Sequence, residues 1–125
     1  MANNGKYSLC DRALERVLTC EADQLGDLTV EKIAQALKVS QSYLTRLFRK
    51  QRDCSLKDYL IREKMVRTAF LLISEPGLTV KQLSAKMGYL DSNYFAGVFK
   101  NYFGISPGKY RKCKENGDGH ASGKK

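Results

Sequence analysis

The stretch LTVEKIAQALKVSQSYLTRLFRK, residues 28–50, occurs a second time in altered form as LTVKQLSAKMGYLDSNYFAGVFKN, residues 78–101. Each copy begins with a threonine suited to cap a helix, Thr29 in the first copy and Thr79 in the second. A short helix with apolar residues on one side, a break, and a second helix that ends in basic residues follow in each copy. This order of elements is that of a helix-turn-helix, so the sequence predicts two such motifs in one chain.

Three further helices are predicted outside the two copies. A Ser-x-x-Asp pattern opens one helix at Ser8 and the longest one, about 55–74, at Ser55, while Ser106-Pro107 opens a short last helix. No window alternates as a strand does. We therefore predict an all-α fold of about seven helices, with two helix-turn-helix subdomains joined by a long linker helix. The predicted segments are a flexible leader (1–7), the first subdomain (8–53), the linker helix (54–75), the second subdomain (76–113) and a flexible tail (114–125).

The composition indicates a folded domain with a strong positive charge. Apolar residues make up 42% of the chain, and 22 Lys and Arg against 13 Asp and Glu give a net charge of +9. Such a charge favours a polyanionic partner, although it does not choose among DNA, RNA and anionic lipid. No run approaches the length of a membrane span, and residues 1–8 are polar, so we expect neither a membrane span nor a signal peptide.

Neither metal binding nor catalysis is expected. Cys10, Cys20, Cys54 and Cys113 are widely spaced, and the single histidine, His120, lies in a Gly/Ser/Lys-rich segment, so no zinc-ligand spacing exists. Two disulfides are an alternative, but without a secretion signal we prefer reduced thiols. The folded part contains no histidine, no paired carboxylates and no Gly-rich phosphate loop, so we expect no enzyme and no cofactor.

Residues 88–111 read GYLDSNYFAGVFKNYFGISPGKYR and closely resemble the hallmark segment of the AraC/XylS family of bacterial transcription regulators. The resemblance extends over about residues 9–112. It implies two helix-turn-helix subdomains bridged by a linker helix, with both recognition helices in successive major grooves, ~34 Å apart on one face of the DNA. The matching positions in the hallmark segment are Gly88, Tyr94, Phe95, Phe99, Lys100, Phe103, Gly104, Pro107, Tyr110 and Arg111.

The first recognition helix has a polar open side. Residues 42, 45, 46 and 49 lie three or four positions apart and therefore share one face. The resemblance implies that Ser42, Thr45 and Arg46 contact base edges, and an arginine can pair with O6 and N7 of guanine. A merely solvated basic face is the alternative. Phosphate contacts are predicted from Gln41, Arg49, Lys50 and Arg52.

The second recognition helix offers less to a base. By the same alignment its groove-facing positions are Ser92, Asn93, Ala96 and Gly97. Asn93 could pair with adenine, whereas Ala96 and Gly97 offer little more than a contact with a thymine methyl group. Two interpretations stay open: weak base recognition, or contact with the DNA backbone alone. Phosphate contacts are predicted from Lys100 and Asn101.

Aromatic and aliphatic residues at helical spacing are predicted to build the core. A stacking platform for single-stranded nucleic acid would need exposed rings, which this inward pattern does not predict. Leu18, and Val66, Phe70 and Ile73 of the long helix, are also predicted to pack inward, and Arg111 is expected to fasten the last helix. The aromatic residues predicted to be buried are Tyr43, Phe48, Tyr94, Phe95, Phe99 and Phe103.

We therefore expect a sequence-specific regulator of transcription that binds double-stranded DNA, and the resemblance implies an activator that contacts RNA polymerase. The alternative is a protein-interaction module on the same fold with only non-specific DNA binding. RNA is a poor fit, because the major groove of A-form RNA does not admit such helices. The resemblance further implies a cytoplasmic, nucleoid-associated protein, monomeric as an isolated domain and dimeric as part of a longer regulator.

Overall fold

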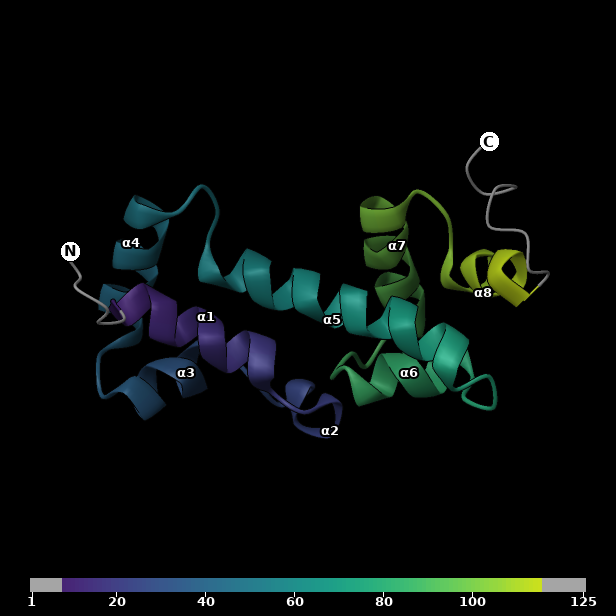
Figure 1. Cartoon of the computed structure of the whole chain (residues 1–125), viewed down its shortest axis with the longest axis horizontal. Helices are drawn as coiled ribbons and strands as arrows, with labels where there is room; N and C mark the ends of the chain where they lie inside the picture. The colour runs from purple at the N-terminus through teal and green to yellow at the C-terminus, as the bar shows by residue number, and fades with distance from the viewer. Residues whose placement is uncertain (1–7, 116–125) are drawn as a thin grey trace. The chain divides into compact units, whose positions relative to one another are not determined.

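The computed structural model describes residues 8–115, and these residues form eight helices and no strand (Figure 1). The all-α prediction is confirmed, with one short helix more than predicted. The chain divides into two compact units, unit 1 of residues 1–63 and unit 2 of residues 64–125. The helices are α1 (Leu9–Thr19), α2 (Ala22–Leu25), α3 (Val30–Leu37), α4 (Gln41–Gln51), α5 (Leu56–Ser74), α6 (Val80–Lys86), α7 (Ser92–Phe103) and α8 (Pro107–Glu115).

Local capping explains where most of these helices begin. At Ser8 the predicted capping box forms, because the Asp11 amide donates to the Ser8 hydroxyl and the Asp11 carboxylate accepts from the Ser8 amide. A second capping box forms between Thr79 and Gln82 at the start of α6. Each capping side chain satisfies an amide that has no partner within the helix. Side-chain oxygens also cap α3 to α5, α7 and α8, at Thr29, Ser40, Ser55, Asp91 and Ser106.

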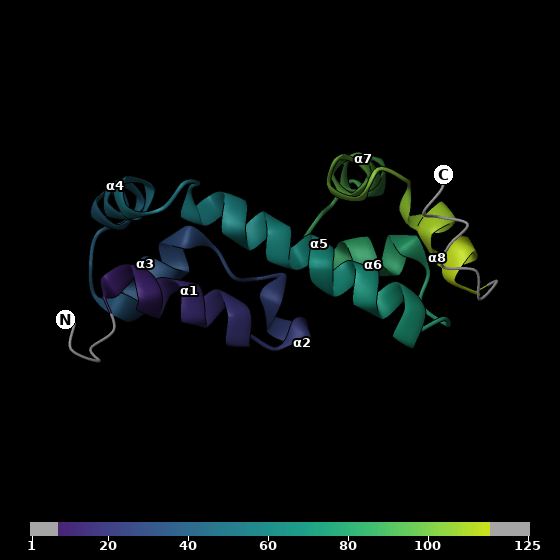
Figure 2. The ribbon, with the colours of Figure 1, turned by 45° about the horizontal axis from the view of Figure 1, so that its top comes forward.

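Unit 1 is built around α1, α3 and α4, which all contact one another (Figures 1 and 2). Ile33 of α3, Leu44 of α4 and Val17 of α1 are fully buried among them. Phe48 of α4 is also buried, and its ring meets the ring of Tyr59, from the first part of α5, edge to face at 5.5 Å. Leu18 is 52% exposed, so its predicted inward position is wrong.

Unit 2 comprises the second part of α5 with α6, α7 and α8, and within it α7 contacts both α6 and α8. Phe95 and Phe99 of α7 are fully buried, as predicted. The Arg111 guanidinium of α8 donates to the carbonyl oxygens of Leu72, at 2.9 Å, and Glu75, at 3.2 Å. Those carbonyls lie at the end of α5, where a helix leaves acceptors unsatisfied. Arg111 therefore fastens α8 to the unit, as predicted.

The long helix α5 has a single buried side in unit 2. The predicted burial of its second apolar side is wrong. Val66, Phe70 and Ile73 are exposed, Phe70 to 67%. The buried positions are three and four residues apart and so lie on one face. They include Thr68, whose buried hydroxyl donates a hydrogen bond to the Lys64 carbonyl oxygen at 2.8 Å. The buried set is Met65, Thr68, Ala69 and Leu72.

The ends of the chain differ from the predicted segments in one respect. The predicted leader, residues 1–7, lies outside the described residues, as does the predicted tail from residue 116 onward. Lys114 and Glu115, placed in the tail by the sequence, belong to helix α8. The Lys114 ammonium lies 5.6 Å from the centre of the Tyr110 ring, which holds this end of the helix. No helix in the described part of the chain is long and apolar enough to cross a membrane.

Candidate nucleic-acid interface

Helix α4 separates its residues sharply into a buried and an exposed side. Ser40 caps its first turn by accepting from the Tyr43 amide at 3.1 Å. Leu44 and Phe48 turn into the core of unit 1. The packing of these two residues leaves the opposite side of the helix to solvent. The predicted base and phosphate contacts on this helix are exposed, except for Thr45, which is half-buried; the exposed ones are Gln41, Ser42, Arg46, Arg49 and Lys50.

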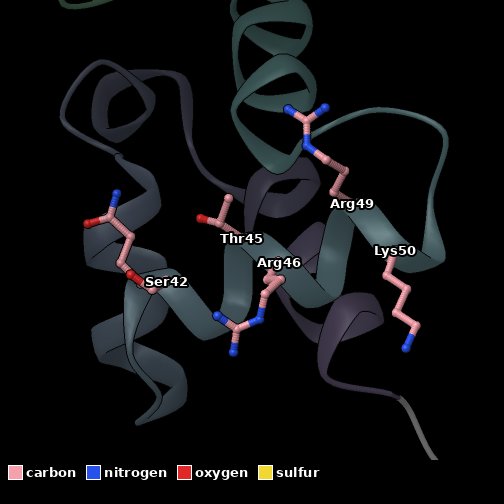
Figure 3. Close-up of a pocket in the computed structure, with 6 residues that line it drawn as sticks. Ser42, Thr45, Arg46, Arg49 and Lys50 are labelled. Atoms are coloured by element: carbon pink, nitrogen blue, oxygen red, sulfur yellow. The ribbon is translucent and has the colours of Figure 1, made fainter.

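An open hollow on this side of α4 brings the predicted contacts together. All three predicted base-contacting residues of unit 1 line it, with three of the four predicted phosphate contacts. Figure 3 shows the guanidinium groups of Arg46 and Arg49 projecting from α4 in different directions. The lining residues are Gln41, Ser42, Thr45, Arg46, Arg49 and Lys50.

The hollow is electropositive. Arg46, Arg49 and Lys50 supply three cations, and none of its lining residues is acidic. Within residues 8–115 none of the three makes an ion pair, so their charges are directed to solvent. This arrangement suits a polyanion with many evenly spaced charges, which is what the DNA backbone presents.

Arg52, the fourth predicted phosphate contact, has a structural partner. It forms an ion pair with Asp11, and its guanidinium lies 5.8 Å from the centre of the Phe48 ring. Asp11 uses one carboxylate oxygen for Arg52 and the other for the capping box with Ser8. The pair thus ties the end of α4 to the beginning of α1. A phosphate contact by Arg52 stays a prediction.

Helix α7 of unit 2 has the same local design with a barer surface. Asp91 caps it by accepting from the amides of Asn93, at 2.9 Å, and Tyr94, at 3.2 Å. Asn93 and Gly97 are exposed, whereas Ser92 and Ala96 are half-buried. A Cβ atom added at Gly97 would meet no atom within 4 Å. The packing of unit 2 therefore does not require a glycine there.

The sequence missed a second cationic hollow, which lies where α7 ends and α8 begins. Lys100 of α7, one of the predicted phosphate contacts, shares it with Lys109 of α8. Between them the chain turns at Gly104, whose φ of 84° is the left-handed conformation that glycine adopts readily. Ser106 and Pro107 mark the start of α8 in the sequence, but the predicted turn did not show that Lys109 would lie beside Lys100.

The aromatic residues predicted to be buried divide into two groups. Phe48, Phe95 and Phe99 are buried, but Tyr43 and Tyr94 are 45% and 64% exposed, so the prediction is wrong for both tyrosines. Each tyrosine precedes a buried residue, and a step of one residue turns a helix by about 100°, away from the core. Phe103 is 36% exposed at the last position of α7, so its predicted burial is also wrong, although its ring lies 4.6 Å from that of Phe99.

Comparisons with known proteins agree with this arrangement. A family model described as a helix-turn-helix domain matches residues 33–113. The chain is similar to the Msm operon regulatory protein of Streptococcus mutans, with 43% identity over 91 residues that cover 73% of this chain and 32% of that protein. It is also similar to the lactose operon transcription activator of Staphylococcus xylosus, with 36% identity over 84 residues, 67% of this chain and 30% of that protein.

The chain thus spans about a third of the length of these curated relatives. Among solved structures it is similar to a transcriptional regulator from Chromobacterium violaceum described by its AraC-type DNA-binding domain. That match has a TM-score of 0.68 and 22% identity, and it covers 81% of this chain and 90% of the other. At this identity the likeness concerns the fold alone.

Proposed function

This chain belongs to the AraC/XylS family of helix-turn-helix DNA-binding domains, and from that premise we propose that it binds double-stranded DNA sequence-specifically to regulate transcription. The observation that carries the proposal is the exposed, cationic side of α4 opposite its buried side. A helix-turn-helix places such a side in the major groove, where base edges carry a distinct pattern of donors and acceptors.

In this proposal the exposed side of α4 divides its work between bases and backbone. Ser42, Thr45 and Arg46 contact base edges, and Arg46 donates to O6 and N7 of a guanine. The flanking phosphates are contacted by polar and cationic groups that carry no sequence information themselves. On α4 these are Gln41, Arg49 and Lys50, joined by Arg52 where its pair with Asp11 opens.

Helix α7 enters a second major groove and contributes less to sequence recognition. Its proposed base-facing residues are Ser92, Asn93, Ala96 and Gly97, of which Asn93 has the longest side chain. Lys100 and Asn101 contact phosphates at the end of the helix. With two recognition helices in successive grooves, the binding site consists of two parts about one helical turn apart, and the part bound by unit 1 is the more stringent.

Further partners follow from the family rather than from the geometry. One relative is named a transcription activator, and we propose the same sign of regulation here, through contact with RNA polymerase. We also propose a cytoplasmic, nucleoid-associated protein. The isolated domain acts as a monomer, since the two different helices fit an asymmetric site, and a longer regulator containing it pairs as a dimer.

Selection of binding sites from random duplex DNA tests the proposal. We expect an enriched sequence with two parts and stronger base preference in one of them. Titration of a labelled duplex at two salt concentrations adds a physical criterion. If about four phosphates are contacted, a fourfold rise in salt should weaken binding roughly a hundredfold, because counterions are released.

The competing function is a protein-interaction module that binds DNA only non-specifically. The small side chains on α7 favour it, and the cationic side of α4 opposes it. Equal affinity for the selected duplex and for a scrambled duplex of the same length would support the module. Salt-insensitive binding, or none, would overturn DNA binding altogether.

A further inference from the structure

Two tyrosines occupy the same place in the two copies. Tyr43 is the third residue of α4, and Tyr94 is the third residue of α7. The amide of each donates to the capping side chain, to Ser40 at 3.1 Å and to Asp91 at 3.2 Å, so the backbone at both positions is held in the first helical turn. Both rings are substantially exposed, Tyr94 more than Tyr43.

Each tyrosine lies beside the proposed groove-facing side of its helix. Tyr43 precedes Arg46 by three residues and Lys50 by seven, and such spacings place side chains on one flank of a helix. Tyr94 precedes Gly97 and Asn101 by the same spacings. Because Gly97 has no side chain, Tyr94 is the largest group on that flank of α7.

Neither tyrosine is required by the core. The other tyrosine rings near the core pack edge to face on phenylalanines, Tyr59 on Phe48 at 5.5 Å and Tyr110 on Phe99 at 5.6 Å. Tyr43 makes no such ring pair among the described residues, and Tyr94 lies 6.1 Å from Tyr89 in a tilted arrangement. In the part of the chain that the structure describes, neither hydroxyl of Tyr43 and Tyr94 has a hydrogen-bond partner.

An exposed tyrosine with an unused hydroxyl is well suited to an interface, because one end is apolar and the other donates a hydrogen bond. Tyrosine hydroxyls are among the groups that bind phosphate oxygens of DNA. We propose that Tyr43 and Tyr94 each donate their hydroxyl to a phosphate at the edge of the major groove that their helix enters. This inference rests on the proposed function, and it assigns Tyr94 as the main anchor of α7 where Gly97 leaves the surface bare.

Removing only the hydroxyl tests the inference. We expect Tyr43→Phe and Tyr94→Phe to weaken binding about three- to tenfold each, the size of one typical net hydrogen bond. The loss should be the same on the selected and the scrambled duplex, because a phosphate carries no sequence information. Fluorescence anisotropy with a labelled duplex measures both affinities, and thermal unfolding of each variant shows that the fold is intact.

Two controls separate this role from others. Tyr102→Phe removes the hydroxyl of a side chain that is 44% exposed, close to the 45% of Tyr43, but Tyr102 lies seven residues after the buried Phe95 and so on the flank of α7 next to its buried side, away from Gly97. It should change the affinity less than twofold. Arg49→Gln should lower the dependence of log K on log salt by about one, whereas the two tyrosine variants should leave that slope unchanged, because a phenol displaces no counterion.

A chemical change in the DNA identifies the phosphate. In a set of duplexes that each carry one neutral methylphosphonate, one position should weaken the unmodified protein but leave the Tyr94→Phe variant unaffected. If the unmodified protein binds DNA in a salt-dependent way, but Tyr43→Phe and Tyr94→Phe bind as tightly as Tyr102→Phe, the proposed tyrosine contacts are wrong and the proposed function stands. A loss confined to the selected duplex would replace phosphate contact by base contact. Failure of the unmodified protein to bind duplex DNA would overturn the proposed function itself.

Discussion

Helices α4 and α7 have similar buried sides and different exposed sides. Each begins at a capped N-terminus and buries two large side chains, Leu44 and Phe48 in α4, Phe95 and Phe99 in α7. On the outside, α4 presents Arg46 where α7 has Gly97. The two copies can therefore share their buried residues and still differ in their exposed polar residues, because side chains that face solvent contribute little to the stability of the fold.

The largest expected effect concerns the shared interior. We expect Phe48→Ala and Phe99→Ala each to lower the free energy of unfolding by about 3–5 kcal/mol, since both rings are fully buried and their removal leaves cavities. Urea unfolding followed by circular dichroism measures both values. If the loss in free energy of unfolding for one variant were less than half of the loss for the other, the buried sides of the two helices would not be equivalent.

The next effect concerns the outside of α4. Arg46→Ala should cost about 1–3 kcal/mol on the selected duplex and relax the preference at one base pair. A matched control is Arg49→Ala, which should weaken selected and scrambled duplexes alike. If Arg46→Ala also weakened both duplexes equally, Arg46 would be a phosphate contact and the contrast between the two helices would lose its main element.

A gain is expected on the outside of α7. A Cβ atom at position 97 would meet no atom within 4 Å, so Gly97→Arg should add a cation and also stabilise the helix by roughly 0.5–1 kcal/mol. We expect a severalfold higher affinity together with a raised midpoint of thermal unfolding. Gly97→Ala is the control, with the stability gain alone. A raised midpoint without a change in affinity would show that this part of α7 stays away from DNA.

The smallest expected effect concerns the ion pair between Asp11 and Arg52 in unit 1. Asp11→Asn should remove the ion pair with Arg52 while keeping an acceptor for the cap, and we expect a loss of about 0.5 kcal/mol or less, because both side chains are partly exposed. The difference in free energy of unfolding between this variant and the unmodified protein should be smaller still in high salt. If Arg52 is released to bind a phosphate, the same variant should bind DNA more tightly; weaker binding would instead show that the pair positions α4.

The sequence was sufficient where the physics is local. Ser8, Thr29 and Thr79 each cap the helix predicted for them, because an N-cap acts on amides two or three residues away. The four-residue helix α2 was missed, since a single turn shows no apolar period.

At the margins of the apolar stripes, periodicity alone predicted burial for side chains that are exposed. Tyr43 and Tyr94 adjoin buried neighbours, but their side chains turn outward, and Val66, Phe70 and Ile73 are apolar residues on an exposed side. Apart from the role of Arg111 in fastening the last helix, contacts between distant residues could not be anticipated. Asp11 and Arg52 are 41 residues apart, and only the packing of α1 against α4 brings them together. The DNA contacts themselves stay predictions, since they depend on a partner.

The empty space at Gly97 has a consequence for how such a regulator changes over generations. A glycine codon becomes an arginine codon by one nucleotide substitution, and at this position the first atom of the new side chain meets no neighbour within 4 Å. Most substitutions reduce stability, which limits how many a protein can accept. A Cβ atom at position 97 meets no such packing penalty, so under the proposed function the base preference of the second recognition helix can change while the fold is kept.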